Sequence, residues 1–490
     1  MLTELPTVPA EVLNVCKTLK DASFEAYLVG GCVRDLVVSR EPKDWDVTTN
    51  ANPEQIQAVF PETFYENDFG TVGIVTGSSD PRLKVIEVTP YRLESEYSDA
   101  RRPDRVEFSD SLTDDLKRRD FTINAIAYDP ISHILVDEHG GKGDIERKVV
   151  AAVGDPDERF REDALRMLRA VRLSAELDFA IEAQTAAGIA THAAQLEKIS
   201  RERIRDELMR ILMTPRPMQA IYVAQKLGLL KYIVPEAEDG IGIAQNQAHS
   251  YDVFEHLLRS LQHAADKEWP LEVRLAALLH DIGKPKARRW SDEKRDWTFH
   301  GHEVVGARMT YKILQNLHFS RETIDLVTTL VRWHMFFSDP DTVTLSAVRR
   351  MIVNVGKDHI QELLNLRMCD RIGTGRPKEQ PFRLRKYMSM VDEAMRDPIT
   401  VGMLKVDGAK VMDVTREKPG PRIGWILHAL LEEVLDDPAK NTAEYLESRA
   451  VELSKLTDAE LKELGKSGKE RREKEDEAAI RELREKRHVT

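Results

Sequence analysis

The stretch LVGGCVRDLVVSREPKDWDV, residues 28–47, joins an apolar run that ends in a double glycine to two aspartates two positions apart. The apolar run predicts a short strand over residues 26–29, and Gly30-Gly31 predicts a turn from that strand into a helix. A glycine turn before a helix lets the backbone approach a phosphate, which the first N–H groups of the helix can bind. Arg34 would add a guanidinium that donates two hydrogen bonds to the same anion.

The two aspartates of this stretch, Asp44 and Asp46, indicate a metal site. Alternate residues of a strand lie on the same face, so on a strand the two carboxylates would lie side by side. Together with triphosphate oxygens they can hold two Mg²⁺ ions, one for an attacking hydroxyl and one for the leaving pyrophosphate. Glu87, in a predicted strand over residues 83–89, is the candidate for a third carboxylate.

Composition bounds the rest of the chain. The 490 residues are 41% hydrophobic and 32% charged, which is enough apolar material for cores in about three domains. The three cysteines, Cys16, Cys32 and Cys369, are too far apart for a disulfide framework or a cysteine zinc site, and they fit a reducing compartment. We find no apolar membrane span and no signal peptide, so we expect a cytoplasmic protein with no membrane partner.

The net charge of −12 does not indicate a nucleic-acid partner, but it does not exclude one, because binding depends on local clusters. Such clusters of arginine and lysine occur at residues 101–102, 117–119, 159–172 and 201–205.

The spacing of apolar residues changes near Asp157. Before it, residues 26–29, 71–76 and 83–89 are predicted strands among turns and helices; after it, the spacing is helical to the end. This pattern predicts an α+β fold, with a small head and then an all-helical neck, body and tail. The expected boundaries are 1–150, 151–240, 241–400 and 401–490. The charge-rich residues 455–490 are expected to form a solvated, partly frayed helix.

The glycine turn and the aspartate pair resemble the head motif of the nucleotidyltransferases that include bacterial CCA-adding enzymes and poly(A) polymerases. The resemblance continues, in the same order, through residues 118–125, 162–166 and 200–207. It implies a palm-like head in which Asp44 and Asp46 bind Mg²⁺ while a nucleotide is transferred from CTP or ATP to an RNA 3′-hydroxyl. The nucleotide-binding residues that we expect are Gly30, Gly31, Arg34, Arg119, Asp120, Asp163, Arg166, Arg169 and Arg172.

Asp163, Arg166, Arg169 and Arg172 recur at three-residue intervals, on neighbouring positions of one helix face. One interpretation is a surface helix with local ion pairs. The other is base selection, because cytosine and adenine both place an amino donor beside a ring-nitrogen acceptor, which a carboxylate and a guanidinium can bind. In the similar family the matching Asp and Arg form such a template. The resemblance therefore assigns selection to Asp163 and Arg166, and phosphate binding or support to Arg169 and Arg172.

Two segments favour CCA addition to tRNA. Residues 69–75 resemble a strand of the CCA-type enzymes, and residues 94–103 resemble the flexible loop with which full CCA enzymes switch from C to A. Poly(A) polymerases of this family tend to carry basic extensions, whereas this tail is mixed in charge. A poly(A) polymerase stays open as an alternative, as do an RNA-binding protein with relict catalytic sites and a nucleotide phosphohydrolase with a regulatory head.

Six residues of the helical body resemble the HD phosphohydrolase pattern in type and order: His256, His280, Asp281, His302, His334 and Asp370. Imidazole and carboxylate ligands suit one or two divalent ions such as Ni²⁺, Co²⁺ or Mn²⁺, which can supply a hydroxide to a phosphoester. The resemblance implies an HD domain that hydrolyses a phosphomonoester or a 2′,3′-cyclic phosphate. The alternative is a degenerate module that only holds RNA.

Overall fold

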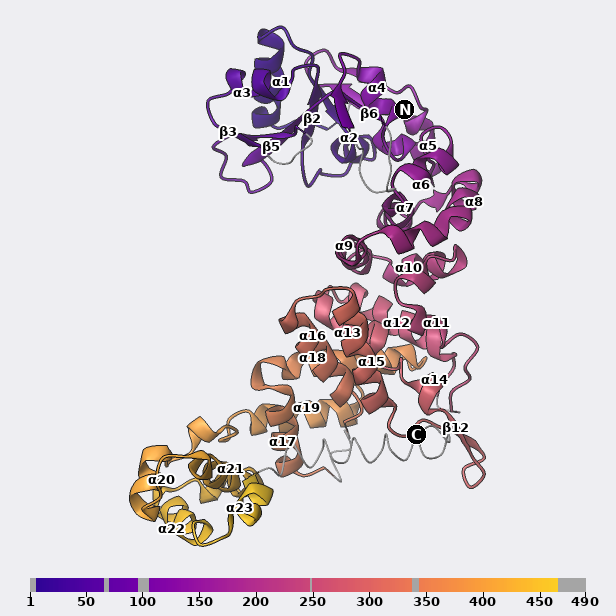
Figure 1. The fold of residues 1–490 in the computed structure, drawn as a ribbon. Coiled ribbons are helices and arrows are strands. Elements are labelled where there is room, and N and C mark those ends of the chain that lie inside the picture. Colours follow the sequence, from indigo (N-terminus) through magenta and orange to yellow (C-terminus); the bar gives the residue numbers. More distant parts are fainter. Residues whose placement is uncertain (1–5, 66–69, 96–104, 247–248, 337–342, 466–490) are drawn as a thin grey trace. The chain divides into compact units, whose positions relative to one another are not determined.

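The computed structural model describes residues 6–65, 70–95, 105–246, 249–336 and 343–465. The chain folds as two compact units, residues 1–233 and 234–490 (Figure 1). In the part of the chain that the structure describes, no helix is long and apolar enough to cross a membrane. Three sequence predictions lie partly outside the described residues: the segment at 69–75, described from residue 70; the loop at 94–103, of which only the first two residues are described; and the tail at 455–490, described to residue 465.

The first unit begins with a seven-stranded mixed sheet in the order β3-β4-β5-β2-β1-β8-β9. β2 and β5 pair in parallel, and the other neighbours pair antiparallel. The strands are β1 (Tyr27–Val29), β2 (Asp46–Thr49), β3 (Thr63–Tyr65), β4 (Val72–Val75), β5 (Val85–Pro90), β8 (Ala127–Asp129) and β9 (Ile134–Val136). Leu28, Val47 and Val88 are fully buried, so the middle strands carry the core of the head.

Short helices and one hairpin complete the head. α1 and α3 contact each other, and α3 packs on β4 and β5 (Figure 1). The helices are α1 (Ala10–Asp21), α2 (Gly31–Val37), α3 (Pro53–Val59), α4 (Leu112–Lys117), η1 (Thr122–Asn124) and α5 (Gly141–Arg147); β6 (Arg92–Ser95) and β7 (Arg105–Phe108) form the hairpin. The residues described at the start of the predicted 94–103 loop therefore end β6.

The remainder of the first unit is helical apart from one short parallel pair, β10 (Val149–Val150) with β11 (Ala180–Ile181). α7 contacts both α9 and α10, and its apolar face is buried at Leu168 and Val171. The elements are α6 (Pro156–Glu162), α7 (Leu165–Leu177), α8 (Ala183–His192), η2 (Ala193–Lys198), α9 (Arg201–Leu212), α10 (Pro217–Lys226) and η3 (Leu230–Tyr232). The helical spacing that the sequence shows after Asp157 is thus confirmed.

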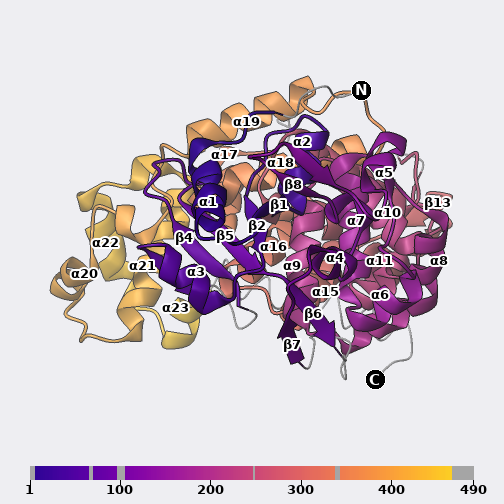
Figure 2. The same ribbon diagram turned by 90° about the horizontal axis from the view of Figure 1, so that it is seen from above.

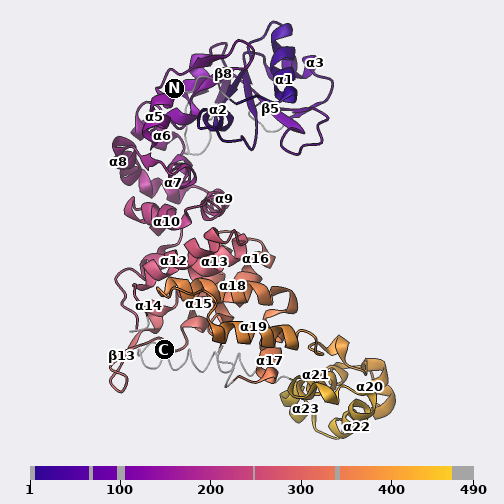
Figure 3. The ribbon, with the colours of Figure 1, turned by 180° about the vertical axis from the view of Figure 1, so that it is seen from behind.

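The second unit is a helical assembly. α12 packs against α13 and α18, and α15 packs against α16 (Figure 3). The first elements are α11 (Pro235–Glu238), α12 (Val253–Asp266), α13 (Leu271–Leu279), α14 (Lys284–Ala287), α15 (His302–Asn316), α16 (Arg321–Trp333), α17 (Leu345–Val355), η4 (Lys357–His359), α18 (Ile360–Gly373) and α19 (Phe382–Ala394). η5 (Val401–Met403), α20 (Gly408–Thr415), α21 (Pro421–Asp436), η6 (Pro438–Lys440), α22 (Ala443–Leu453) and α23 (Asp458–Gly465) follow. α20 to α23 gather at one end of this unit (Figures 1 and 2).

The predicted fold class, a mixed-sheet head followed by a largely helical region, is confirmed, with two corrections to the all-helical neck and body: β11 in the neck, and a hairpin in the body. A hairpin interrupts the helical body between α14 and α15, formed by β12 (Arg289–Ser291) and β13 (Asp296–Thr298). Each strand is three residues long and mostly polar, so the sequence has no alternation of apolar residues that would predict the hairpin. The cross-strand pair of Trp290 and Trp297 stabilises the hairpin instead.

We predict that Gly141→Ala destabilises the first unit. A Cβ atom at Gly141 would lie 2.1 Å from the main-chain oxygen of Thr122, so backbone must shift to admit it. Overpacking of this kind costs about 1–3 kcal/mol, which thermal unfolding should record as a drop of several degrees. Gly143→Ala, in the same helix, is the matched control, because its Cβ would meet only the flexible end of Arg147 at 3.3 Å. Equal melting temperatures for the two variants would contradict the prediction.

Candidate functional site

The parallel pairing of β2 with β5 places Asp46 directly opposite Glu87. Asp46 is the first residue of β2 and is half-buried, whereas Asp44 lies in the bend before the strand and is exposed. The condition under which Asp44 and Asp46 would share one strand face is not met, because Asp44 precedes the strand. Asp46 and Glu87 come from segments about 40 residues apart, and the sheet register makes them neighbours.

The charge around Asp46 favours a cation. Burial raises the pKa of Asp46 to about 6; the nearby Arg119 guanidinium opposes the rise and the carboxylate of Asp44 adds to it. A divalent ion would relieve the repulsion between the two carboxylates, and hard oxygen ligands are what Mg²⁺ prefers. Among the residues that the structure describes, these carboxylates do not converge as a group within 4.8 Å. Oxygens from outside the chain would therefore have to complete the coordination.

The glycine turn lies beside the same carboxylate. Gly30 has a φ of +81°, a conformation that other residues rarely adopt. A Cβ atom there would lie 3.3 Å from Nη1 of Arg119 and 3.5 Å from Oδ2 of Asp46. Arg119 is oriented by the buried carboxylate of Asp115, with Nη2 2.9 Å from Oδ2. The turn, Arg119 and Asp46 therefore meet at one place, directly before α2, which begins at Gly31.

Arg34 and Asp120 are both buried and hydrogen-bonded to other side chains of the head. The buried Arg34 donates to Asp35 Oδ1 from Nε (3.0 Å) and Nη2 (2.8 Å), and to Asn124 Oδ1 from Nη1 (2.9 Å). Asn124 also donates to the buried Asp120, at 3.3 Å. Arg34 is thus engaged with protein acceptors here, so its predicted phosphate contact has no direct geometric support.

The four regularly spaced residues of the base-selection hypothesis each have a different partner. Asp163 lies between α6 and α7, so the prediction that it shares one helix face with the three arginines is wrong; it accepts a hydrogen bond from Arg203 at 2.8 Å. The buried Arg166 donates to Glu162 Oε2 at 2.5 Å. Two further pairs are Arg169 with Asp120 at 2.9 Å and Arg172 with Glu207 at 2.9 Å.

Two of the arginines form local ion pairs, Arg166 with Glu162 and Arg172 with Glu176, and the other contacts join this segment to distant parts of the unit. Arg203 and Glu207 lie on α9, and Asp120 lies in the head, so three of the four partners are far away in the sequence. Sequence reasoning missed Arg203, Glu162 and Asn124 as supporting residues. Arg203 and Asn124 pair with distant segments, which leaves no periodic pattern, whereas Glu162 and Arg166 have a four-residue spacing that the sequence already showed.

The second unit brings all six predicted metal ligands together in its interior. Each is at most 8% exposed. His256 lies on α12 and Asp370 on α18; His280 and His334 follow the last residues of α13 and α16; Asp281 follows His280; and His302 begins α15. Gly283 permits this convergence, because a Cβ atom there would lie 2.3 Å from the main-chain oxygen of His302.

Four of the ligands form a first group. His256 Nε2 lies 2.9 Å from His280 Nε2 and 3.0 Å from Asp281 Oδ2. Asp370 Oδ1 lies 3.5 Å from His256 Nε2 and 3.8 Å from His280 Nε2. These atoms all lie within 4.8 Å of one another, close enough to hold one ion.

Asp281 also belongs to a second group. Its other oxygen, Oδ1, lies 3.1 Å from His302 Nε2 and 3.4 Å from His334 Nε2. One carboxylate therefore connects two sets of ligands, the arrangement that a pair of bridged ions requires.

The Nδ1 contacts of these histidines suit metal binding, and their pKa values report the charge at this centre. His280, His302 and His334 each place Nδ1 within 2.7–3.0 Å of the main-chain carbonyl three residues earlier, which leaves Nε2 for the ion. Burial lowers the pKa of His334 to about 4, so that its ring is neutral. Burial acts in the same direction on His280, but Asp281 and Asp370 raise its pKa to about 9. The two buried carboxylates thus attract positive charge to this centre, and the donor set fits a divalent cation.

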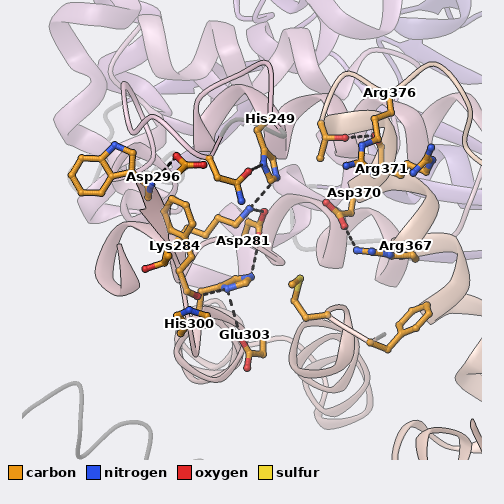
Figure 4. A pocket seen from close by; sticks show the side chains of 18 of the residues that line it. His249, Asp281, Lys284, Asp296, His300, Glu303, Arg367, Asp370, Arg371 and Arg376 are labelled. Carbon is orange, nitrogen blue, oxygen red and sulfur yellow. Dashed lines mark hydrogen bonds and ion pairs between the residues drawn. The ribbon is translucent and has the colours of Figure 1, made fainter. Parts of the chain in front are cut away.

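A cavity of about 1190 Å³ opens over this cluster of six metal ligands (Figure 4). Two cations support the ligands: Lys284 Nζ lies 2.5 Å from Asp281 Oδ2, and Arg367 Nη1 lies 2.6 Å from Asp370 Oδ2. Figure 4 shows Asp281 near the middle of the site, with Arg367 and Asp370 on one side of it. An anionic ligand could reach the metal ligands through this cavity.

Comparison with protein families gives three matches along the chain. Residues 26–151 match the poly A polymerase head domain, residues 178–241 match a probable RNA and SrmB- binding site of polymerase A, and residues 253–372 match the HD domain.

Individual relatives agree with these matches. A CCA-adding enzyme of Lactobacillus helveticus is 44% identical over 45% of this chain and 54% of its own length. One of Geobacillus thermodenitrificans is 31% identical over 91% of this chain and 97% of its own. The crystal structure of the Bacillus stearothermophilus CCA-adding enzyme in complex with CTP superposes with a TM-score of 0.69 at 27% identity, covering 91% of this chain and 97% of that one. The chain belongs to the family of CCA-adding enzymes with a poly(A) polymerase-type head and an HD domain.

Proposed function

We propose that this protein adds C, C and A to the 3′ end of tRNA from CTP and ATP. The observation that carries the proposal is the β2–β5 register, which sets Asp46 beside Glu87, close to Asp44 and the Gly30 turn. The proposed domains are the head at 1–150, the RNA-binding neck at 151–240, the HD domain at 241–400 and the helical tail at 401–490. A poly(A) polymerase would use the same head, and the identity of the added nucleotides distinguishes the two.

In this reaction the RNA 3′-hydroxyl oxygen forms a bond to the α-phosphorus of the nucleotide, the bond from that phosphorus to the bridging oxygen breaks, and pyrophosphate leaves. Asp44, Asp46 and Glu87 would hold Mg²⁺, which when bound supplies neutralisation of the triphosphate charge. Arg119, oriented by Asp115 beside the glycine turn, contributes a second positive charge toward the phosphates. The turn itself leaves room for the nucleotide because Gly30 has no side chain.

Base selection is assigned to Asp163 and Arg166. The carboxylate accepts from the amino group of cytosine or adenine, and the guanidinium donates to the neighbouring ring nitrogen. Arg203 and Glu162 orient these two side chains. Arg169 and Arg172 tie the same helix to the head and to α9 through Asp120 and Glu207.

The HD centre is proposed to hydrolyse terminal phosphoesters of RNA, a 2′,3′-cyclic phosphate above all. A water oxygen bonds to phosphorus, the bond from phosphorus to one ribose oxygen breaks, that oxygen takes a proton from the water, and a phosphomonoester remains. A second water then displaces the other ribose oxygen from phosphorus, which releases phosphate and leaves a free hydroxyl. The six ligands would hold Ni²⁺, Co²⁺ or Mn²⁺, which when bound supplies activation of the water. Lys284 and Arg367 hold the ligand carboxylates in place. A degenerate module that only holds RNA is the competing proposal.

Asp44→Ala and Asp46→Ala are each expected to abolish nucleotide addition, a loss of at least about 10³-fold, because the site then lacks the charge that holds Mg²⁺. The measurement is incorporation of each labelled nucleotide into tRNA that lacks its 3′ end. Thermal unfolding checks that both variants stay folded. Normal CCA completion by both would remove these residues from the mechanism.

Asp163→Ala and Arg166→Ala are expected to relax discrimination against UTP and GTP by roughly tenfold or more, because hydrogen bonds carry the selection. Competition between correct and incorrect nucleotides measures the ratio. Arg203→Ala should shift the ratio in the same direction but less, since it acts through Asp163. Arg201→Ala on the same helix is the matched control, because Arg201 bonds the carbonyl of Tyr232 instead. Unchanged ratios in the first two variants would refute the template.

The combined change His280→Ala with Asp281→Ala is expected to remove both bound ions and all metal-dependent hydrolysis while sparing CCA addition. Asp281 contributes to both ligand groups, so its loss affects each. Metal content after dialysis against Mn²⁺ and hydrolysis of adenosine 2′,3′-cyclic phosphate are the measurements. Hydrolysis that persists in this variant would place the activity elsewhere, and wild-type protein that binds metal without hydrolysis would favour the module that only holds RNA.

A further inference from the structure

The cavity over the HD centre is larger than a phosphoester needs. Its volume of about 1190 Å³ exceeds the range of about 300–1,000 Å³ that encloses whole small-molecule ligands. The metal ligands Asp281, His302 and Asp370 form only a part of its lining. The remaining lining therefore has room to contact the molecule that carries the ester.

That lining is basic, although the whole chain has a net charge of −12. The lining contains six lysines and arginines and four acidic residues. Two of the acidic residues are the ligands Asp281 and Asp370, which form ion pairs with Lys284 and Arg367. The other four basic residues outnumber the two other acids; they are Lys294, Arg371, Arg376 and Arg383. This excess favours a ligand with more than one phosphate.

One wall of the cavity offers a fixed aromatic ring. Trp297, on β13, lines the cavity and is half-buried. The Arg288 guanidinium lies over this ring at 3.6 Å from its centre, and the ring of Trp290 meets it edge-on at 5.3 Å. Because both contacts hold the indole in place, a base can stack on it with little further loss of entropy.

The side of the cavity with Arg371 and Arg376 lies across Asp281 from this wall. Figure 4 shows Asp296, the neighbour of Trp297 on β13, on one side of Asp281, and Arg371 and Arg376 on the other. A terminal nucleotide of RNA has the same layout, since its base and its 5′-phosphate extend in different directions from the ribose that bears the 3′ ester.

We propose that the HD cavity binds the last nucleotide of an RNA strand together with the phosphate that links it to the preceding nucleotide. The base stacks on Trp297, the linking phosphate lies by Arg371 and Arg376, and the terminal ester reaches the metal ligands. This inference rests on the proposed HD function for its chemistry, but the binding that it describes stands separately. An oligonucleotide end is then a better ligand than a mononucleotide with the same terminal group.

The test compares a dinucleotide and a mononucleotide that both end in adenosine 3′-phosphorothioate, a slowly hydrolysed probe. Their dissociation constants are measured calorimetrically with the full chain in Mn²⁺. We expect the dinucleotide to bind at least about tenfold more tightly. Trp297→Ala should weaken both probes roughly five- to hundredfold, with partial recovery in Trp297→Phe. Arg376→Gln should weaken only the dinucleotide and lower the slope of log Kd against log salt by about 0.7.

Arg385→Gln is the matched control, because Arg385 is exposed on α19 and does not line the cavity. Equal affinities for the two probes, or unchanged binding in Trp297→Ala, would overturn the inference. Hydrolysis of the corresponding cyclic phosphates is measured in parallel. If the wild type does not hydrolyse them but binds as described, the proposed hydrolase fails and the nucleotide site stands. If it hydrolyses them without preference for the dinucleotide, the proposed hydrolase stands and the nucleotide site fails.

Discussion

The first site depends on the parallel pairing of β2 with β5. A shift of one residue in this register would move Glu87 to the opposite face of its strand and separate it from Asp46. The register is stabilised by burial, because Val47 and Val88 are partners in it and both are fully inaccessible. The hydroxyl of Thr48 adds a hydrogen bond to the carbonyl of Thr89, at 3.1 Å. Hydrophobic burial on one face of the sheet therefore fixes the carboxylates on the other.

Buried charge is organised differently in the two units. In the first, arginines and acids pair across distant segments, as Arg169 does with Asp120, and the pairs hold the helix α7 against the head. In the second, Asp281 and Asp370 each pair with one cation, Lys284 or Arg367, and also direct carboxylate oxygens at histidine nitrogens. The same type of residue therefore joins two elements in one unit and forms a cluster of possible metal ligands in the other.

The sequence predicted the parts of both sites that lie in short motifs. The Gly30-Gly31 turn and the strand with Glu87 could be recognised because turns and strands have local signatures. The six HD ligands could be recognised because their order and types resemble a known pattern, although no spacing rule brings six helical residues from 256 to 370 together. The partners Arg203 and Asn124 could not, since pairing between distant segments depends on tertiary packing. The hairpin with Trp297 was missed because its strands are short and polar.

The chemistry of the two centres is complementary. A nucleotidyltransferase head needs a free 3′-hydroxyl on its RNA, and a strand that ends in a 2′,3′-cyclic phosphate lacks one. Hydrolysis of that ester and then of the resulting monoester restores the hydroxyl, so the product of the proposed HD reaction is the substrate of the head. The two proposed reactions also use different metal environments: the exposed Asp44 and Glu87 with the half-buried Asp46 in the head, and a buried set of nitrogen and oxygen ligands in the HD domain. One fold could not supply both from a single pocket, which gives a physical reason for two sites in one chain.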